Sequence, residues 1–190
     1  MVLAQLYLNA GRRDDAYQTA RLAMGDPDLD SETRIALMKS LMAEAEQGQR
    51  PDAAEAENLL QLFRLLEQMD GKLPSVILVG GDLQMALGNR RQAALAYRRA
   101  LRNGATEYQA WNNLFILDLE ARQYDSLIIH TEEALESFPN LSAVWYFNGT
   151  GHLQRKRYTE AVASLEQARK LNPENPLKAE INGQLGEAYQ

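Results

Sequence analysis

The stretch WYFNGTGHLQRKRYTEAVASLEQARKLNP, from Trp145 to Pro173, decides the fold. It holds Gly149 and Gly151 two residues apart, followed by a basic cluster at 155–157. Glycines ahead of cations can cradle a phosphate, whereas small residues inside a helix let a second helix approach closely. A phosphate loop of the P-loop type needs a preceding strand and the pattern Gly-x4-Gly-Lys-Ser/Thr, and this stretch has neither. We therefore interpret Gly149 and Gly151 as packing residues of a helix.

The rest of the chain also shows helical periodicity. Apolar residues recur at spacings of three and four, as in Leu59, Leu62, Phe63 and Leu66. No sustained alternation of apolar and polar residues occurs, so strands are not expected. Short turns rich in Gly and Pro separate the segments, as in a series of helical hairpins. The sequence therefore predicts an all-α fold.

A fixed spacing of 34 residues relates three successive segments. Four columns keep it: Gly81, Phe115 and Gly149; Ala93, Leu127 and Ala161; Tyr97, Thr131 and Leu165; and Ala100, Ala134 and Ala168. A period kept in four columns is the signature of stacked repeats rather than of chance amphipathicity.

These columns resemble the tetratricopeptide repeat (TPR) family, whose units pair a helix bearing a small residue with a helix bearing two alanines. The best matching unit contributes Trp145, Gly149, Ala161, Leu165, Ala168 and Pro173. In it, Asn148 and His152 stand where leucine and tyrosine are usual, and in the preceding unit Phe115 fills the small position. The resemblance covers nearly the whole chain and implies a right-handed α-solenoid of stacked antiparallel helix pairs, a TPR superhelix.

We expect a single TPR array over residues 1–190. The repeats are expected at 1–30 (partial), 31–73 (long and irregular), 74–107, 108–141, 142–178 and 179–190 (first helix only). In the irregular unit, the first helix is expected to run through Glu46 and the second from Asp52 to Met69. Because both termini fall inside repeats, we expect a fragment of a longer chain, and the repeat pattern looks like that of Bacteroidetes-type bacterial proteins.

Composition and motifs argue against several kinds of chemistry. The formal net charge of −6 and the pI near 5.0 disfavour nucleic-acid binding, and the chain has no cysteine and no apolar run that could span a membrane. His130 and His152 lack the spacing of a metal site, and we expect His152 to be packed and hydrogen-bonded in a helix. No Gly-x-Ser-x-Gly elbow is present. We expect no catalytic residue, metal or cofactor.

The resemblance implies that the first helices of the repeats line a groove for an extended peptide or a partner helix. The residues expected to face this groove are Lys39, Met42, Leu78, Asp82, Met85, Asn112, Asn113, Ile116, Tyr146, Thr150 and Leu153. Asparagines suit a peptide backbone, and methionines and aromatics suit apolar side chains. Members of the resembled family that clamp a terminal carboxylate use several lysines, arginines and asparagines in this groove, and here only Asn113 and Lys39 match that arrangement.

The leading hypothesis is therefore a non-enzymatic interaction scaffold whose partner is a protein or peptide. The alternative is an architectural spacer, or a module that self-associates through exposed repeat ends, within a larger multidomain or periplasmic protein. The sequence leaves the compartment open: cytoplasmic, or periplasmic if the parent chain carries a signal removed here.

Overall fold

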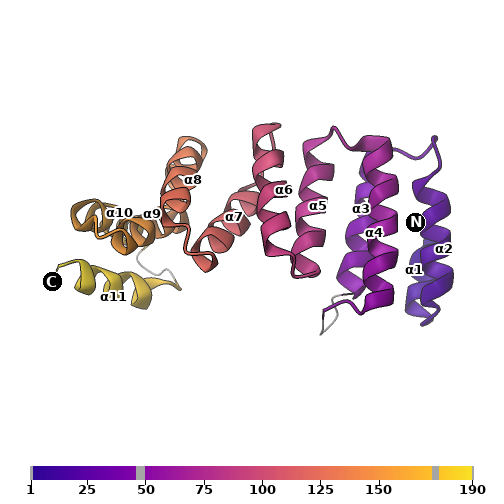
Figure 1. The fold of residues 1–190 in the computed structure, drawn as a ribbon, viewed down its shortest axis with the longest axis horizontal. Coiled ribbons are helices and arrows are strands. Elements are labelled where there is room, and N and C mark those ends of the chain that lie inside the picture. Colours follow the sequence, from indigo (N-terminus) through magenta and orange to yellow (C-terminus); the bar gives the residue numbers. More distant parts are fainter. Residues whose placement is uncertain (1, 46–49, 173–175, 190) are drawn as a thin grey trace. The chain divides into compact units, whose positions relative to one another are not determined.

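The computed structural model describes residues 2–45, 50–172 and 176–189, which form eleven α-helices and no strand (Figure 1). The helices are α1 (Val2–Asn9), α2 (Arg13–Met24), α3 (Ser31–Ala45), α4 (Ala53–Asp70), α5 (Pro74–Ala86), α6 (Arg90–Arg102), α7 (Tyr108–Glu120), α8 (Tyr124–Ser137), α9 (Ser142–Gln154), α10 (Tyr158–Leu171) and α11 (Lys178–Ala188). The predicted all-α fold is confirmed. Glu46 and Pro173 lie outside the described residues.

Successive helices pack in pairs, α1 with α2, α3 with α4, and so on to α9 with α10 (Figure 1). The chain divides into two compact units, Met1–Ala105 with α1 to α6 and Thr106–Gln190 with α7 to α11. Within the first unit α3 packs on α5, and within the second α9 packs on both α7 and α11. The first helices α3 and α5 are therefore neighbours in the first unit, and α7, α9 and α11 follow one another in the second. The single array over 1–190 stays a prediction.

Glycine at the small-residue column sets how closely two helices of a pair approach. A Cβ atom at Gly149 would lie 2.7 Å from Leu165 Cγ and 3.2 Å from the carbonyl oxygen of Ala161, and one at Gly81 would lie 2.7 Å from the Tyr97 ring. The interpretation of Gly149 as a helix-packing residue is confirmed, since it lies inside α9 against α10. Phe115 occupies the same column in α7, and α7 packs less closely on α8 than α9 does on α10.

The turns inside the pairs use left-handed backbone at equivalent positions. Gly88 has φ +74°, and Arg122 and Lys156, which follow it at intervals of 34 residues, have φ 54° and 57°. Only glycine adopts this conformation without steric cost, so Arg122 and Lys156 hold mildly strained backbone. The shared geometry shows that the turn is fixed by the repeat rather than by its local sequence.

The irregular pair, α3 with α4, is held at its ends by polar contacts. Asp52 accepts from the backbone N–H of Glu55 at 2.8 Å, and the Glu55 side chain accepts from the N–H of Asp52, which closes a capping box at the start of α4. At the other end, Arg34 Nη1 donates to Asp70 Oδ2 at 2.8 Å and Ser31 Oγ donates to Asp70 Oδ1 at 2.6 Å. Arg34 is buried, so this ion pair fixes α3 against the last turn of α4.

Each unit has its own apolar core. In the first unit, Leu59, Leu62 and Leu66 of α4 are fully buried, as their spacing of three and four predicts. In the second, Phe115 is fully buried and its ring centroid lies 5.4 Å from that of Phe147 on α9. Burial of these faces, more than helix propensity, stabilises the helices.

Candidate peptide-binding surface

The residues predicted to face a groove lie on first helices in both units. In the first unit they come from α3 and α5, and in the second from α7 and α9. Four of them are buried, with exposed fractions below a tenth: Met42, Leu78, Thr150 and Leu153. A ligand can reach little of these side chains without displacing others, so they are better placed to support a surface than to contact a partner.

In the first unit, Lys39, Asp82 and Met85 keep accessible surface. Asp82 Oδ1 accepts a hydrogen bond from the hydroxyl of Tyr97 on α6 at 2.7 Å. Desolvation raises the pKa of Asp82 above its usual 3.8, while the Tyr97 hydrogen bond and the positive charge of Lys39 on α3 act in the opposite direction. This surface therefore combines a half-buried carboxyl group, an exposed ammonium group and a thioether.

In the second unit, the half-buried side chains are Asn112, Asn113 and Ile116 on α7 and Tyr146 on α9. Both asparagines are oriented by neighbours one turn earlier in α7. Tyr108 donates its hydroxyl to Asn112 Oδ1 at 3.3 Å, and Gln109 Nε2 donates to Asn113 Oδ1 at 2.8 Å. These bonds orient the two side-chain amides through their oxygens. An asparagine amide has both an oxygen acceptor and N–H donors, which are the groups that pair with the N–H and C=O groups of a peptide backbone.

Tyr146 lies where the aromatic packing of α9 meets the surface. Its ring centroid lies 5.4 Å from that of Phe147, in an edge-to-face arrangement. On the next turn, the Thr150 hydroxyl lies 2.9 Å from the carbonyl oxygen of Tyr146 and 3.0 Å from Gln184 Oε1 on α11. Thr150 is therefore used to join α9 to α11, which explains why it is buried.

Sequence reasoning missed the polar contacts inside the pairs of the second unit. His130 Nδ1 on α8 lies 2.5 Å from Asp118 Oδ2 on α7, and Asp118 is buried. In the next pair, Ser164 Oγ donates to Asn148 Oδ1 at 2.7 Å, and Asn148 Nδ2 donates across to Thr131 Oγ1 on α8 of the preceding pair at 2.9 Å. The repeat positions marked some of these residues as unusual. Asn148 stands where leucine is usual, and His130 of α8 and Ser164 of α10 are polar residues that occupy the same position in successive repeats.

His152 is packed as predicted, but its hydrogen bonding differs from the prediction. The residue is 8% exposed, and its Nδ1 atom has no hydrogen-bond partner among the described residues. Burial lowers the pKa of His152 below its usual 6.5, with Arg157 acting in the same direction and Glu160 and Glu132 against it. Burial therefore favours the neutral form of the His152 imidazole.

Within residues 2–45, 50–172 and 176–189, no group of three or more His, Cys, Asp or Glu side chains could hold a metal ion. No helix of this described part is both long and apolar enough to cross a membrane. The basic cluster at 155–157 lies in the turn after α9, where Arg155 Nε is 2.9 Å from Asp125 Oδ1 on α8. Its role is thus at least partly to join neighbouring helices.

Comparison with solved structures places this geometry in a known class. No protein-family model and no curated protein matches the sequence. YrrB, described as a TPR protein with an unusual peptide-binding site, is 16% identical over 84% of this chain and 76% of its own, with a TM-score of 0.67. MamA is 17% identical over 95% of this chain and 98% of its own, also with a TM-score of 0.67.

A third similar structure, the TPR2AB domain of yeast Sti1 in its complex with pHSP90, is 14% identical and covers 98% of this chain and 96% of that chain, with a TM-score of 0.54. The pairs of helices define a helical-repeat protein. The small-residue column and these similarities identify the repeat, and the chain has the tetratricopeptide repeat fold.

Proposed function

We propose that the chain is a non-enzymatic interaction module that binds an extended peptide or a partner helix along its first helices. The observation that carries the proposal is the surface of α7 and α9, where two oriented asparagines lie on the same unit as a half-buried isoleucine and tyrosine. Such a surface can hydrogen-bond a peptide backbone and bury an apolar side chain. The peptide-binding site of YrrB and the Sti1 complex with pHSP90 support this function for the fold.

The test selects binders to the full chain from a displayed library of random peptides and titrates them against variants. The double variant Asn112→Ala/Tyr146→Ala is expected to weaken binding about tenfold or more, because it removes a polar and an aromatic contact at once. A control double variant, Asn140→Ala/Tyr158→Ala, changes an exposed asparagine and an exposed tyrosine of the same unit outside these helices. Unchanged affinity of every selected peptide for the first variant would exclude this surface.

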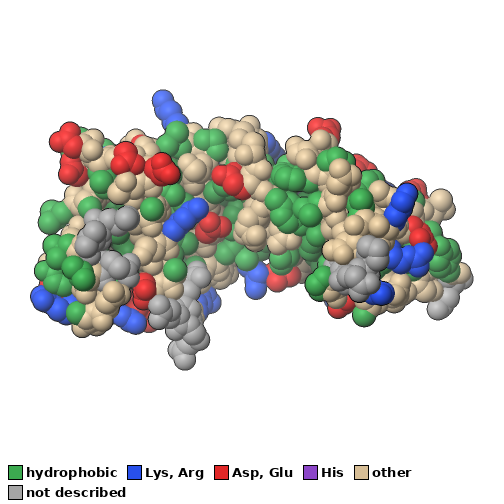
Figure 2. All heavy atoms as spheres, turned by 180° about the vertical axis from the view of Figure 1, so that it is seen from behind, with side chains coloured by type: hydrophobic (Ala, Val, Ile, Leu, Met, Phe, Trp, Pro, Cys, Tyr) green, Lys and Arg blue, Asp and Glu red, His purple; other side chains and the backbone are tan. Residues whose placement is uncertain are grey.

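The second candidate function is self-association, and exposed leucines on the first pair favour it. Leu3 and Leu6 on α1 are 52% and 57% exposed, and Leu22 on α2 is 79% exposed. Figure 2 shows hydrophobic side chains gathered at the part of the surface formed by these first two helices. Sedimentation of the chain over a range of concentrations tests this function, and a monomer at every concentration would exclude it.

A further inference from the structure

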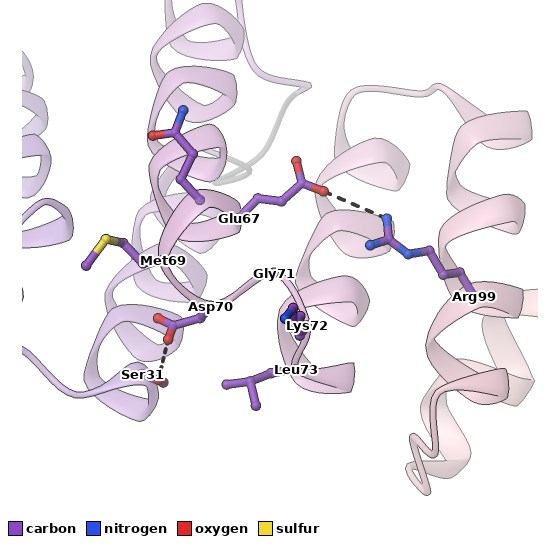
Figure 3. Close-up of a pocket in the computed structure, with 9 residues that line it drawn as sticks. Ser31, Glu67, Met69, Asp70, Gly71, Lys72, Leu73 and Arg99 are labelled. Atoms are coloured by element: carbon purple, nitrogen blue, oxygen red, sulfur yellow. Dashed lines mark hydrogen bonds and ion pairs between the residues drawn. The ribbon is translucent and has the colours of Figure 1, made fainter.

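A groove separate from the proposed peptide-binding surface runs between α4 and α6, with α5 at its base. It consists of two adjoining hollows, of about 560 and 220 Å³, which share Glu67 of α4 and Arg99 of α6 (Figure 3). We call these two hollows the α4–α6 groove. The groove is formed entirely by the first unit, and neither hollow includes a residue predicted to bind a partner.

Apolar side chains line the groove without being covered. Met69 and Leu73 line the larger hollow and are 44% and 39% exposed, and Leu95 lines the smaller one and is 51% exposed. The floor of the smaller hollow includes Phe63, whose ring lies so close to Gly80 that a Cβ atom there would be 2.6 Å away. The absent side chain of Gly80 lets the ring lie against α5, which keeps the hollow open above it. A concavity with exposed apolar side chains offers a partner apolar surface to bury.

Two cations, Arg99 and Lys72, line the groove together with these apolar groups. Arg99 belongs to α6, whose sequence RRQAALAYRRALR contains five arginines and no carboxylate, although the whole chain has a formal net charge of −6. Arg99 extends from α6 toward Glu67, with Nη1 3.8 Å from Oε1, and Lys72 lies in the turn after α4 (Figure 3). The Arg99–Glu67 pair is half exposed on both sides, so it contributes little and Arg99 can bind another carboxylate.

Asp70, the other carboxylate of the larger hollow, is already engaged. Its two oxygens accept from Ser31 and from the buried Arg34, and Figure 3 shows its side chain directed to Ser31 rather than toward Arg99. Of the two carboxylates that line the groove, only Glu67 is then left to pair with Arg99 and Lys72. This arrangement is complementary to a ligand that brings both carboxylates and apolar side chains.

We propose that the α4–α6 groove is a second docking site, and that its occupant is an amphipathic acidic peptide segment of another protein. Leucine-like side chains of the segment contact Leu73 and Leu95, while its carboxylates pair with Arg99 and Lys72. The groove is open along its length and has dispersed apolar groups, which suits several side chains of a peptide better than one enclosed small molecule. Its concave form also suits a peptide better than a flat membrane surface.

The experiment uses the full chain and the same displayed library of random peptides, with variants that divide the binders into two groups. Peptides that bind the α4–α6 groove are expected to be enriched in Asp and Glu together with Leu, Ile or Phe. Leu95→Ser and Arg99→Gln should each weaken them about tenfold, while Asn112→Ala/Tyr146→Ala leaves them unchanged. Raising the salt concentration should reduce their affinity for the wild-type chain and have less effect on Arg99→Gln.

Two exposed residues of the second unit provide matched controls. Ile129 on α8 is 53% exposed, and the side chain of Arg169 on α10 is 48% exposed and pairs with Glu166 of the same helix. Ile129→Ser and Arg169→Gln should leave the binding of acidic peptides unchanged. The proposal is overturned if no selected peptide is sensitive to Leu95→Ser and Arg99→Gln, or if the sensitive peptides have no acidic excess. It is also overturned if those variants abolish binding to phosphatidylserine vesicles and affect no peptide.

Discussion

The pairs α7/α8 and α9/α10 occupy the same positions in two successive repeats, yet they are held together differently. Where α9 has Gly149 against Leu165, α7 has the fully buried Phe115. The glycine lets the helix backbones approach, whereas the phenylalanine holds them apart and fills the space with its ring. The polar contacts differ as well, an acidic group with a histidine in the first pair and an amide with a hydroxyl in the second.

The difference teaches that the repeat fixes which positions meet, and the side chains decide how closely. The positions of Asp118 and His130 in one pair correspond to those of His152 and Ser164 in the next, at a spacing of 34 residues. In the first pair these two positions bond to each other. In the second, Ser164 bonds to Asn148 instead, and His152 Nδ1 has no hydrogen-bond partner among the described residues. One backbone arrangement thus accepts several contact patterns.

The largest effect is expected from removing the ring that separates α7 from α8. Phe115→Ala should lower the free energy of unfolding by about 3–5 kcal/mol, because it empties a fully buried site whose backbones cannot close on it. Urea unfolding followed by circular dichroism measures the change. Ile116→Ala, at the half-buried neighbouring position on α7, is the control and should cost clearly less. Equal losses for the two variants would mean that Phe115 is not what separates the helices.

The opposite substitution tests the close approach of α9 and α10. Gly149→Ala should destabilise the chain by about 1–2 kcal/mol, because the new Cβ meets Leu165 Cγ and a backbone carbonyl that cannot move aside. Gly186 lies on the exposed surface of α11, where no neighbouring helix lies within 4 Å of the position that a Cβ atom would take. Gly186→Ala should therefore stabilise by up to about 1 kcal/mol through helix propensity. Thermal unfolding of both variants gives the two signs, and a shared sign would contradict the packing role of Gly149.

The sequence predicted the helices and their pairing better than it predicted the surface. The 34-residue spacing and the small residues predicted the packing role of Gly149 correctly, because two helices that approach closely need small residues at the same positions of successive repeats. The sequence could not show that Thr150 is buried and bonded to Gln184 of α11, because no motif marks that contact between two repeats. Nor could it pair Asp118 with His130, since no motif marks a single contact between two helices. The groove residues themselves stay a prediction.

The neutral polar contact of α9/α10 offers a smaller and more specific test. Asn148→Leu restores the residue usual for the repeat, but leaves the buried hydroxyl of Ser164 without Asn148 Oδ1 as its acceptor. We expect a loss of about 1 kcal/mol. The double variant Asn148→Leu/Ser164→Ala removes both partners of this bond, while Thr131 loses the Asn148 donor but keeps its bond to the backbone of α8, so the stability of the double variant should return close to that of the wild type. If the double variant loses as much free energy of unfolding as the two single variants together, the hydrogen bond between Asn148 and Ser164 does not account for the loss.

The smallest expected effect concerns the left-handed turns between α5 and α6 and between α9 and α10. Gly88 has a left-handed conformation in the first unit without cost, whereas Lys156 has it with a side chain. Lys156→Gly should stabilise the chain by about 0.5 kcal/mol, the relief of strain being partly offset by the greater freedom of glycine in the unfolded chain. Replacing the exposed Arg157, the next residue, with glycine provides the control and should not stabilise, because its φ is −90°. If Lys156→Gly proves neutral or destabilising in urea unfolding, then contacts of the lysine side chain outweigh the strain of its backbone.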